Sequence, residues 1–144
     1  VMNELAPLVS AQYGAFFLAE ESELQLISAY GYPVETGRPD RFRLGQALVG
    51  QAASTRRTIA VDEVPAGYVK VSSGLGESLP ASLIVLPIVV EEQVLGVIEL
   101  ASVQPFTSVH RTFLDQLMET IGVNLNTIVA NARTDELLKE SQRL

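Results

Sequence analysis

The chain contains no cysteine and no tryptophan, and its 144 residues include a single histidine, His110. The absence of cysteine excludes disulfide bonds, thiolate metal sites and cysteine nucleophiles, and it agrees with a reducing cytoplasm as the location. One histidine cannot form a paired-histidine metal motif such as HExxH. A hydroxyl nucleophile would need His110 as its base, and the neighbouring Ser108 and Thr112 have no evident carboxylate partner of the required kind. We therefore predict that this chain is not an enzyme and holds no metal ion.

Basic residues and long apolar runs are also scarce. The chain has 10 lysines and arginines against 17 acidic residues, a net charge of −7, so on average it repels a phosphate backbone and no nucleic-acid partner is expected. The small arginine groups at 38–43 and 56–57 are interpreted as solvated loop charges. The longest uncharged apolar run, residues 81–90, is far shorter than the roughly 20 residues of a membrane-spanning helix. Without a secretory signal, we expect a cytoplasmic fragment that does not enter a membrane, although its parent could be anchored elsewhere.

A length of 144 residues with 47% hydrophobic composition favours one globular domain. Its clearest local pattern lies at residues 81–102, where two apolar runs flank the acidic residues 91–93, and this predicts an antiparallel hairpin. Pro87 and Gly96 interrupt the two runs, so each marks a place where strand pairing bends or another group comes close. The turn lacks the Asn-Gly or Asp-Gly pair typical of tight hairpins, which leaves its type open.

Upstream of this hairpin the pattern alternates between strands and helices. The segment 31–43 is predicted to be a surface loop and the segment 62–80 a long irregular one, because glycine and proline recur in both. A loop as long as 62–80 in a compact domain usually has a function or is mobile. Periodicity predicts strands at 13–19, 23–30 and 58–61, and helices at 44–55 and at 1–10, where the first helix looks cut short.

From Ser108 the apolar spacing is helical to the end of the chain. We predict that one face of this helix covers the sheet while another meets a second copy of the chain, giving a homodimer. Gly122 would cost about 1 kcal/mol relative to alanine in a helix, so it is predicted to mark a close approach to the domain or a partner. The charged residues 133–144 are predicted to begin a signalling coiled coil. The dimer and signalling residues, most of them on a heptad seam, are Leu114, Met118, Ile121, Leu125, Ile128 and Leu137.

Five short segments of the chain form a characteristic series: YGAFFL at 13–18, FRLGQALVGQAA at 42–53, TIAVDEV at 58–64, SLIVLPIVV at 82–90 and LGVIELA at 95–101. In order and spacing, these segments resemble a GAF domain, the small-molecule sensor module of signalling proteins. The segments 106–114 and 124–138 are similar to GAF domains that precede the kinase core of bacterial hybrid sensor histidine kinases. The resemblance implies an α+β, PAS/GAF/profilin-like fold over residues 1–132. In that fold the terminal helices cover one face of a central antiparallel sheet, and a loop-covered pocket lies on the other face.

The resemblance also implies where a ligand would bind. The pocket would be roofed by the 62–80 segment and floored by the strands around 16–18 and 83–86. Glycines in the roof permit unusual backbone conformations whose free amides could hold an anion, while its serines, tyrosine and lysine offer hydroxyls, a ring and a charge. A flexible surface turn is the alternative, and Gly-Leu-Gly alone is no dinucleotide fingerprint. The candidate ligand residues are Phe17, Tyr68, Lys70, Ser72, Ser73, Gly74, Gly76 and Ile84.

The known ligand classes of GAF domains can be compared with these residues. Covalent bilin attachment and the free-methionine sulfoxide reductases of this fold both use cysteines, which are absent here. A haem ligand would have to be His110, which opens the last helix away from the implied pocket. The cyclic-nucleotide class carries an Asn-Lys…Phe…Asp-Glu pattern, but the chain has no Asn-Lys pair and its Asp62-Glu63 lies in a different place. We therefore expect no cofactor and an unidentified small-molecule ligand.

These interpretations lead to a functional prediction with one alternative. The chain is predicted to be the regulatory sensor domain of a bacterial two-component protein, a hybrid histidine kinase. Ligand capture under the 62–80 segment would bias the packing of the terminal helix and pass the change along a coil. Alternatively, a plug of Phe17, Leu75 and Ile84 fills the pocket, and the domain is a ligand-free dimerisation spacer.

Overall fold

The computed structural model describes residues 2–30, 41–62, 71–73, 76–78 and 82–143. Six strands in these residues form one antiparallel sheet in the order β3-β2-β1-β8-β7-β4, and β5 pairs with β6 in a separate two-stranded sheet. The strands are β1 (Tyr13–Glu20), β2 (Glu23–Tyr30), β3 (Arg41–Arg43), β4 (Ile59–Val61), β5 (Val71–Ser73), β6 (Gly76–Ser78), β7 (Ser82–Val90) and β8 (Gln93–Ser102).

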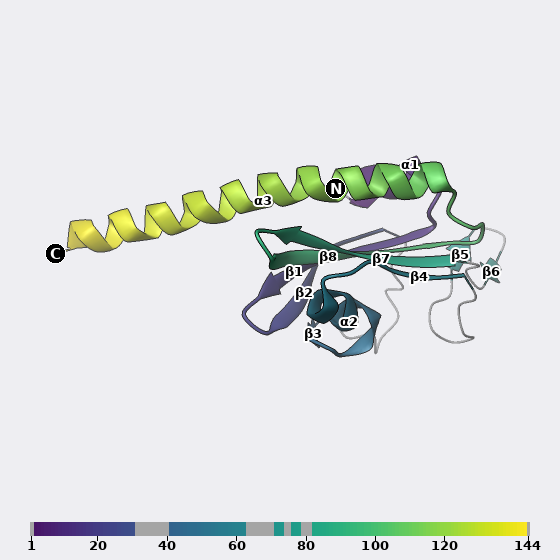
Figure 1. The fold of residues 1–144 in the computed structure, drawn as a ribbon, viewed down its shortest axis with the longest axis horizontal. Helices are drawn as coiled ribbons and strands as arrows, with labels where there is room; N and C mark the ends of the chain where they lie inside the picture. The colour runs from purple at the N-terminus through teal and green to yellow at the C-terminus, as the bar shows by residue number, and fades with distance from the viewer. Residues whose placement is uncertain (1, 31–40, 63–70, 74–75, 79–81, 144) are drawn as a thin grey trace.

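Three helices cover the two faces of the large sheet (Figure 1). Helix α1 (Met2–Leu8) and the long helix α3 (Ser108–Arg143) lie on one face, and α2 (Ala47–Thr55) lies on the other. The structure thus confirms the predicted α+β class, the central antiparallel sheet and the placement of both terminal helices on one face. None of the helices in the described part of the chain is both long enough and apolar enough to cross a membrane.

The chain folds this way because β7 and β8 are buried on both sides. Successive side chains along a strand point to opposite faces of the sheet, so every second residue faces α1 and α3 and the residues between them face α2. The residues facing α1 and α3 form a core with these helices that includes Leu86, Ile98, Leu100, Leu114 and Met118. The residues facing α2 form a separate core, made by Tyr13, Ala15, Phe17, Leu24, Val49, Ala52, Ala53, Leu83, Val85, Val97 and Ala101.

Two of the predicted irregular segments contain strands instead. Residues 41–43 form β3, because Phe42 pairs with Leu24 and places its ring edge-on to Phe17, with 5.5 Å between ring centroids. Part of the 62–80 segment forms the β5–β6 pair, although glycines and prolines surround it. Helix α2 begins at Ala47 rather than at the predicted residue 44. The remaining predicted helices and strands match the structure to within a few residues at each end.

The predictions for two glycines are confirmed. A Cβ on Gly96 would lie 2.7 Å from the backbone oxygen of Phe17, since β8 runs directly beside β1 at this point. A Cβ on Gly122 would lie 2.8 Å from Cγ2 of Val90, because α3 crosses closely over the end of β7. Gly122 therefore marks contact with the domain itself.

The β7–β8 turn resolves the question that its sequence left open. Glu91 and Glu92 have φ angles of 51° and 67°, so both adopt the left-handed conformation required of a type I′ turn. Glutamate is unfavourable in that conformation, because its Cβ crowds the backbone. The hairpin keeps the turn because the two flanking strands pair from Val90–Gln93 to Ser82–Ser102, with one irregularity between Ile88 and Val89.

The predicted dimer seam needs correction. Leu114 and Met118 are 0% and 7% exposed and belong to the core between α3 and the sheet, and Ile121 and Leu125 are partly buried against that core. Leu114 and Met118 are therefore not available to a partner helix, whereas Ile121 and Leu125 pack against the same core but keep part of their surface exposed. Ile128 is 63% exposed, and Leu137 lies in α3 where side chains are not described.

Candidate functional site

The face of the sheet toward α2 carries one buried charged residue among those described, Glu99. Glu99 is 4% exposed and lies on β8, an internal strand of the sheet. Directly paired residues share a face, so Ala15 of β1 and Val85 of β7 flank it on either side, with Ile59 beyond Val85. The carboxylate therefore rises from the middle of an otherwise apolar face.

Two buried aromatic residues share this face with Glu99. Tyr13 pairs with Ala101, and Phe17 pairs with Val97, so the two rings belong to the neighbouring rows on either side of the Glu99 row. Tyr13 is 1% exposed and Phe17 is 2% exposed. Tyr13 and Glu99 each take part in at least one polar or ring interaction. A carboxylate next to aromatic rings is an arrangement that suits a cationic nitrogen group.

The candidate ligand residues that the structure describes lie in different parts of the fold. Phe17 lies in the core on the α2 side, whereas Ile84 lies in the core on the α3 side, so the two do not line one pocket or form one plug. The cause is register: Ile84 immediately precedes Val85, and consecutive strand residues face opposite sides. Ser72, Ser73 and Gly76 belong to the β5–β6 pair, where Ser73 pairs with Gly76. Tyr68, Lys70, Gly74 and Leu75 lie outside the described residues.

Glu99 is the residue that sequence reasoning missed. The sequence pattern predicts the run Leu95–Ala101 as one apolar strand of a hairpin and assigns no role to the glutamate inside it. The available signal was a single acidic residue within a strand flanked by apolar residues on both sides, since charged residues are almost never fully buried unless paired.

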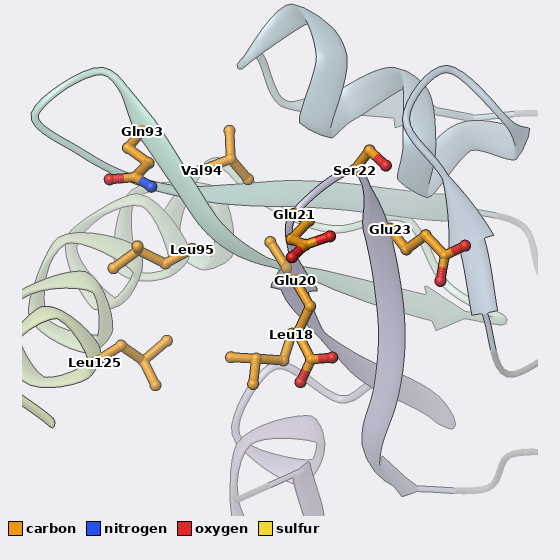
Figure 2. A pocket seen from close by; sticks show the side chains of 10 residues that line it. Leu18, Glu20, Glu21, Ser22, Glu23, Gln93, Val94, Leu95 and Leu125 are labelled. Carbon is orange, nitrogen blue, oxygen red and sulfur yellow. The ribbon is translucent and has the colours of Figure 1, made fainter. Parts of the chain in front are cut away.

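A cleft lies at the start of β8, between the β1–β2 and β7–β8 turns and α3 (Figure 2). This cleft has a volume of about 780 Å³ and is lined by the β1–β2 turn, the start of β8, and Leu125 of α3. Its three carboxylates, on Glu20, Glu21 and Glu23, are all exposed, and Glu23 lies 3.8 Å from Arg41. Because solvent reaches all three carboxylates, the cleft resembles an open acidic surface more than an enclosed ligand site.

His110 has a structural position at the start of α3. Its backbone N–H donates to Oγ1 of Thr107 at 3.1 Å, and its Nδ1 accepts a hydrogen bond from the backbone N–H of Thr107 at 3.3 Å. This reciprocal pair caps the helix in the manner of a capping box. Within the described residues, no three histidine, aspartate or glutamate side chains gather as metal ligands.

Comparison with known proteins identifies the fold family. The family model described as "GAF domain" matches residues 1–126. No protein with a curated description matches the chain. Among solved structures, the GAF domain of phosphoenolpyruvate-protein phosphotransferase from Acinetobacter is similar to this chain, with 18% sequence identity and a TM-score of 0.71. The match covers 92% of this chain and 81% of the Acinetobacter chain.

Two further structures show the range of proteins that share this fold. The second GAF domain of DevS from Mycobacterium smegmatis has 19% identity and a TM-score of 0.71, with 92% of each chain covered. A type II free methionine-R-sulfoxide reductase from Thermoplasma acidophilum has 16% identity and a TM-score of 0.65, covering 87% of this chain and 86% of its own. The fold therefore occurs as a GAF domain of a phosphotransferase and of DevS, and also in a reductase. Together with the family model, the sheet order and the helix placement show that this chain belongs to the GAF domain family.

Proposed function

We propose that this domain is a regulatory sensor module of a bacterial two-component signalling protein. It binds a small molecule on the α2-facing side of the sheet and relays binding through α3. The observation that carries this proposal is that α3 packs on the domain with its first part and extends beyond the domain with the rest. The first part of this 36-residue helix belongs to the domain core, and the remainder extends beyond the sheet (Figure 1). A helix placed in this way transmits any change in the sheet to whatever follows it.

Contacts at three levels of α3 support the relay. Arg111 Nη2 lies 3.7 Å from Asp62 Oδ1, at the start of the 62–80 segment that the sequence assigns to the pocket roof. Leu114 packs into the core shared with β7 and β8, and Gly122 touches the end of β7. The Arg111–Asp62 pair is exposed and contributes little to stability, so it can break and form again at little cost in free energy.

We further propose that the domain is a homodimer formed through the exposed stripe of α3. Val109, Phe113 and Val123 lie on one side of the helix, away from Leu114 and Met118, and they are 74%, 38% and 61% exposed. Their spacing of four and ten residues fits a heptad pattern, which favours a second helix as the occupant. Lysine at Phe113 and Val123 should give a folded monomer, because neither side chain belongs to a core.

The kinase context rests on the sequence resemblance of residues 106–114 and 124–138 to GAF domains of hybrid histidine kinases. We propose that the domain itself is not catalytic and that it acts in the cytoplasm. The reductase that shares the fold does not argue otherwise, because its 16% identity shows the fold alone.

Native mass spectrometry tests the proposal. The purified chain is measured alone and after incubation with a small-molecule extract of the cell lysate, prepared without detergent. A dimer that carries a reproducible extra mass is expected for a sensor. A dimer with no bound molecule from any extract favours the ligand-free spacer, and a monomer at micromolar concentration contradicts the dimer. The variant with lysine at Phe113 and Val123 should be monomeric and keep the extra mass, which separates the two parts of the proposal.

A further inference from the structure

We propose that the β7–β8 turn couples α2 to the part of α3 that follows Met118, although the two helices lie on opposite faces of the sheet (Figure 1). The link consists of Arg56 at the end of α2, the turn residue Glu92, and the contact between Val90 and Gly122 of α3. It rests on the proposed function for its input, which is a small molecule bound on the α2-facing side. It adds a route from that side to α3 around the end of the hairpin.

The first half of the link is a hydrogen bond between α2 and the turn. Nη1 of Arg56 donates to the backbone oxygen of Glu92 at 3.0 Å, although the two residues are 36 positions apart in the chain. Arg56 also ends α2, since its φ is 58° and its backbone N–H donates to the oxygen of Ala52 at 2.8 Å. Glycine is preferred in this left-handed conformation. Arginine is therefore the less favourable residue for the helix end, and what it adds is a side chain that reaches the turn.

The second half of the link is the contact between α3 and the end of β7. A Cβ on Gly122 would lie 2.8 Å from Cγ2 of Val90, 3.3 Å from Cγ2 of Ile88 and 3.8 Å from the backbone oxygen of Val89. Helix α3 therefore rests on the three residues that immediately precede the turn. This contact follows Met118, at the point where the apolar side chains of α3 change from buried to partly buried.

The outer edge of the hairpin end is open. Strand β4 pairs with β7 only over residues 83–85, so within the described residues the stretch 86–90 pairs with β8 alone. Pro87 offers no N–H to a further strand, and the register shifts between Ile88 and Val89. A shift of α2 can therefore move the turn without breaking strand pairing at this edge. A cavity of about 210 Å³ lies along the edge, with Arg56, Thr58, Pro87, Val89 and Asp115 in its lining.

Hydrogen exchange, measured by NMR at single amides of the ligand-free chain, tests the link. Arg56→Gly removes the side chain but places the preferred residue at the left-handed end of α2, so it separates the link from the stability of α2. Arg56→Lys keeps a donor for the oxygen of Glu92 and serves as the rescue variant. Arg57→Gly is the matched control, because it makes the same change at the adjacent exposed arginine.

We expect Arg56→Gly to lower the exchange protection of amides 119–125 in α3 by at least about threefold, because an exposed hydrogen bond contributes modestly. Amides 52–55 of α2 and 111–114 of α3 should keep the protection of the wild type. Arg56→Lys should restore most of the loss, and Arg57→Gly should not reproduce it. Unchanged protection at 119–125 would overturn the link, and so would an equal loss at 111–114, which indicates general destabilisation.

A second measurement approaches the turn from the side of α3. The Cβ added by Gly122→Ala presses on Val90, so its effect on the urea midpoint should depend on whether Arg56 holds the turn. Distant sites that act independently have additive effects on stability. The double variant Arg56→Gly with Gly122→Ala should therefore have a midpoint that differs from the sum of the two single changes. An additive double variant would show that the two ends of the link are independent, which contradicts the inference.

Both measurements use the chain without a ligand, so their outcome does not depend on whether a small molecule binds. If the coupling is absent but native mass spectrometry finds a dimer with a reproducible extra mass, the sensor function stands and the link is wrong. If the coupling is present but no extract adds a mass, the link stands as a property of the fold and the sensor function is wrong.

Discussion

Replacing Leu114 by alanine should destabilise the domain itself, and the effect should not depend on protein concentration. Leu114 is 0% exposed and packs in the core between α3 and the sheet. A buried leucine-to-alanine change costs about 2–5 kcal/mol, part of it for the cavity left behind. Because α3 covers the sheet as a single helix, it can move partly into that cavity, and we expect about 3 kcal/mol. For a domain of this size that corresponds to a decrease in melting temperature of roughly 10 °C.

The matched control is the same change at an exposed leucine, Leu8→Ala on α1. Leu8 is 65% exposed and lies outside the proposed dimer stripe, so its truncation should change the unfolding free energy by less than about 0.5 kcal/mol. Urea unfolding followed by circular dichroism at two protein concentrations measures both variants. If Leu114→Ala and Leu8→Ala cost the same, or if the cost of Leu114→Ala disappears on dilution, α3 does not lie on its own sheet in the orientation described here.

Three other changes test local features of the fold. Gly122→Ala adds a Cβ 2.8 Å from Cγ2 of Val90, so it should lower stability by about 1 kcal/mol despite better helix propensity, and urea unfolding should show the loss shrinking in a Val90→Ala background. Replacing Glu91 and Glu92 by Asn-Gly should raise the unfolding free energy by about 1 kcal/mol, because both positions have positive φ; a thermal melt without any gain would contradict the type I′ turn. Thr107→Ala removes the hydroxyl that accepts from the backbone N–H of residue 110 and should cost about 1 kcal/mol, whereas Thr107→Ser should restore the lost stability in the same melt.

The sequence was sufficient for most of the fold because its local signals agree with the tertiary structure. The acidic pair between two apolar runs predicts the β7–β8 hairpin, and heptad spacing after Ser108 predicts α3. The short edge strand β3 is not predicted because three alternating residues, RFR, are too few to indicate a strand, and β3 is held by its pairing with β2. Pairing between distant segments is a tertiary effect that local propensity does not contain.

The same limit explains the errors in the candidate site. Residues 82–88 of β7 are all buried, so the strand reads as one apolar run with no polar side to mark its orientation. The family resemblance groups Phe17 and Ile84 in one pocket floor, and only the observed register places them on opposite faces. The heptad seam of α3 could likewise fit a sheet or a partner helix, since both surfaces are apolar.

The position of Glu99 also limits how a ligand could act on α3. On β8, Glu99 faces α2, while the adjacent Ile98 and Leu100 face the terminal helices and are both 0% exposed. A tightly packed strand cannot move on one face alone, so a shift at Glu99 reaches the other core within one residue. This is the shortest route between the proposed ligand site and α3.

The magnitudes decide which part of α3 can respond. Converting a 1:99 population into 99:1 needs about 5.5 kcal/mol of differential binding, whereas a hydrogen bond to a charged group contributes about 1.5–3 kcal/mol. A ligand held mainly by one such hydrogen bond can therefore switch only an equilibrium that is already close to balance. Separating Leu114 or Met118 from the sheet would cost more than that, because both are buried in the core. Ile121 and Leu125 are only partly buried. In the proposed relay, the part of α3 that responds is therefore the partly buried stretch after Met118.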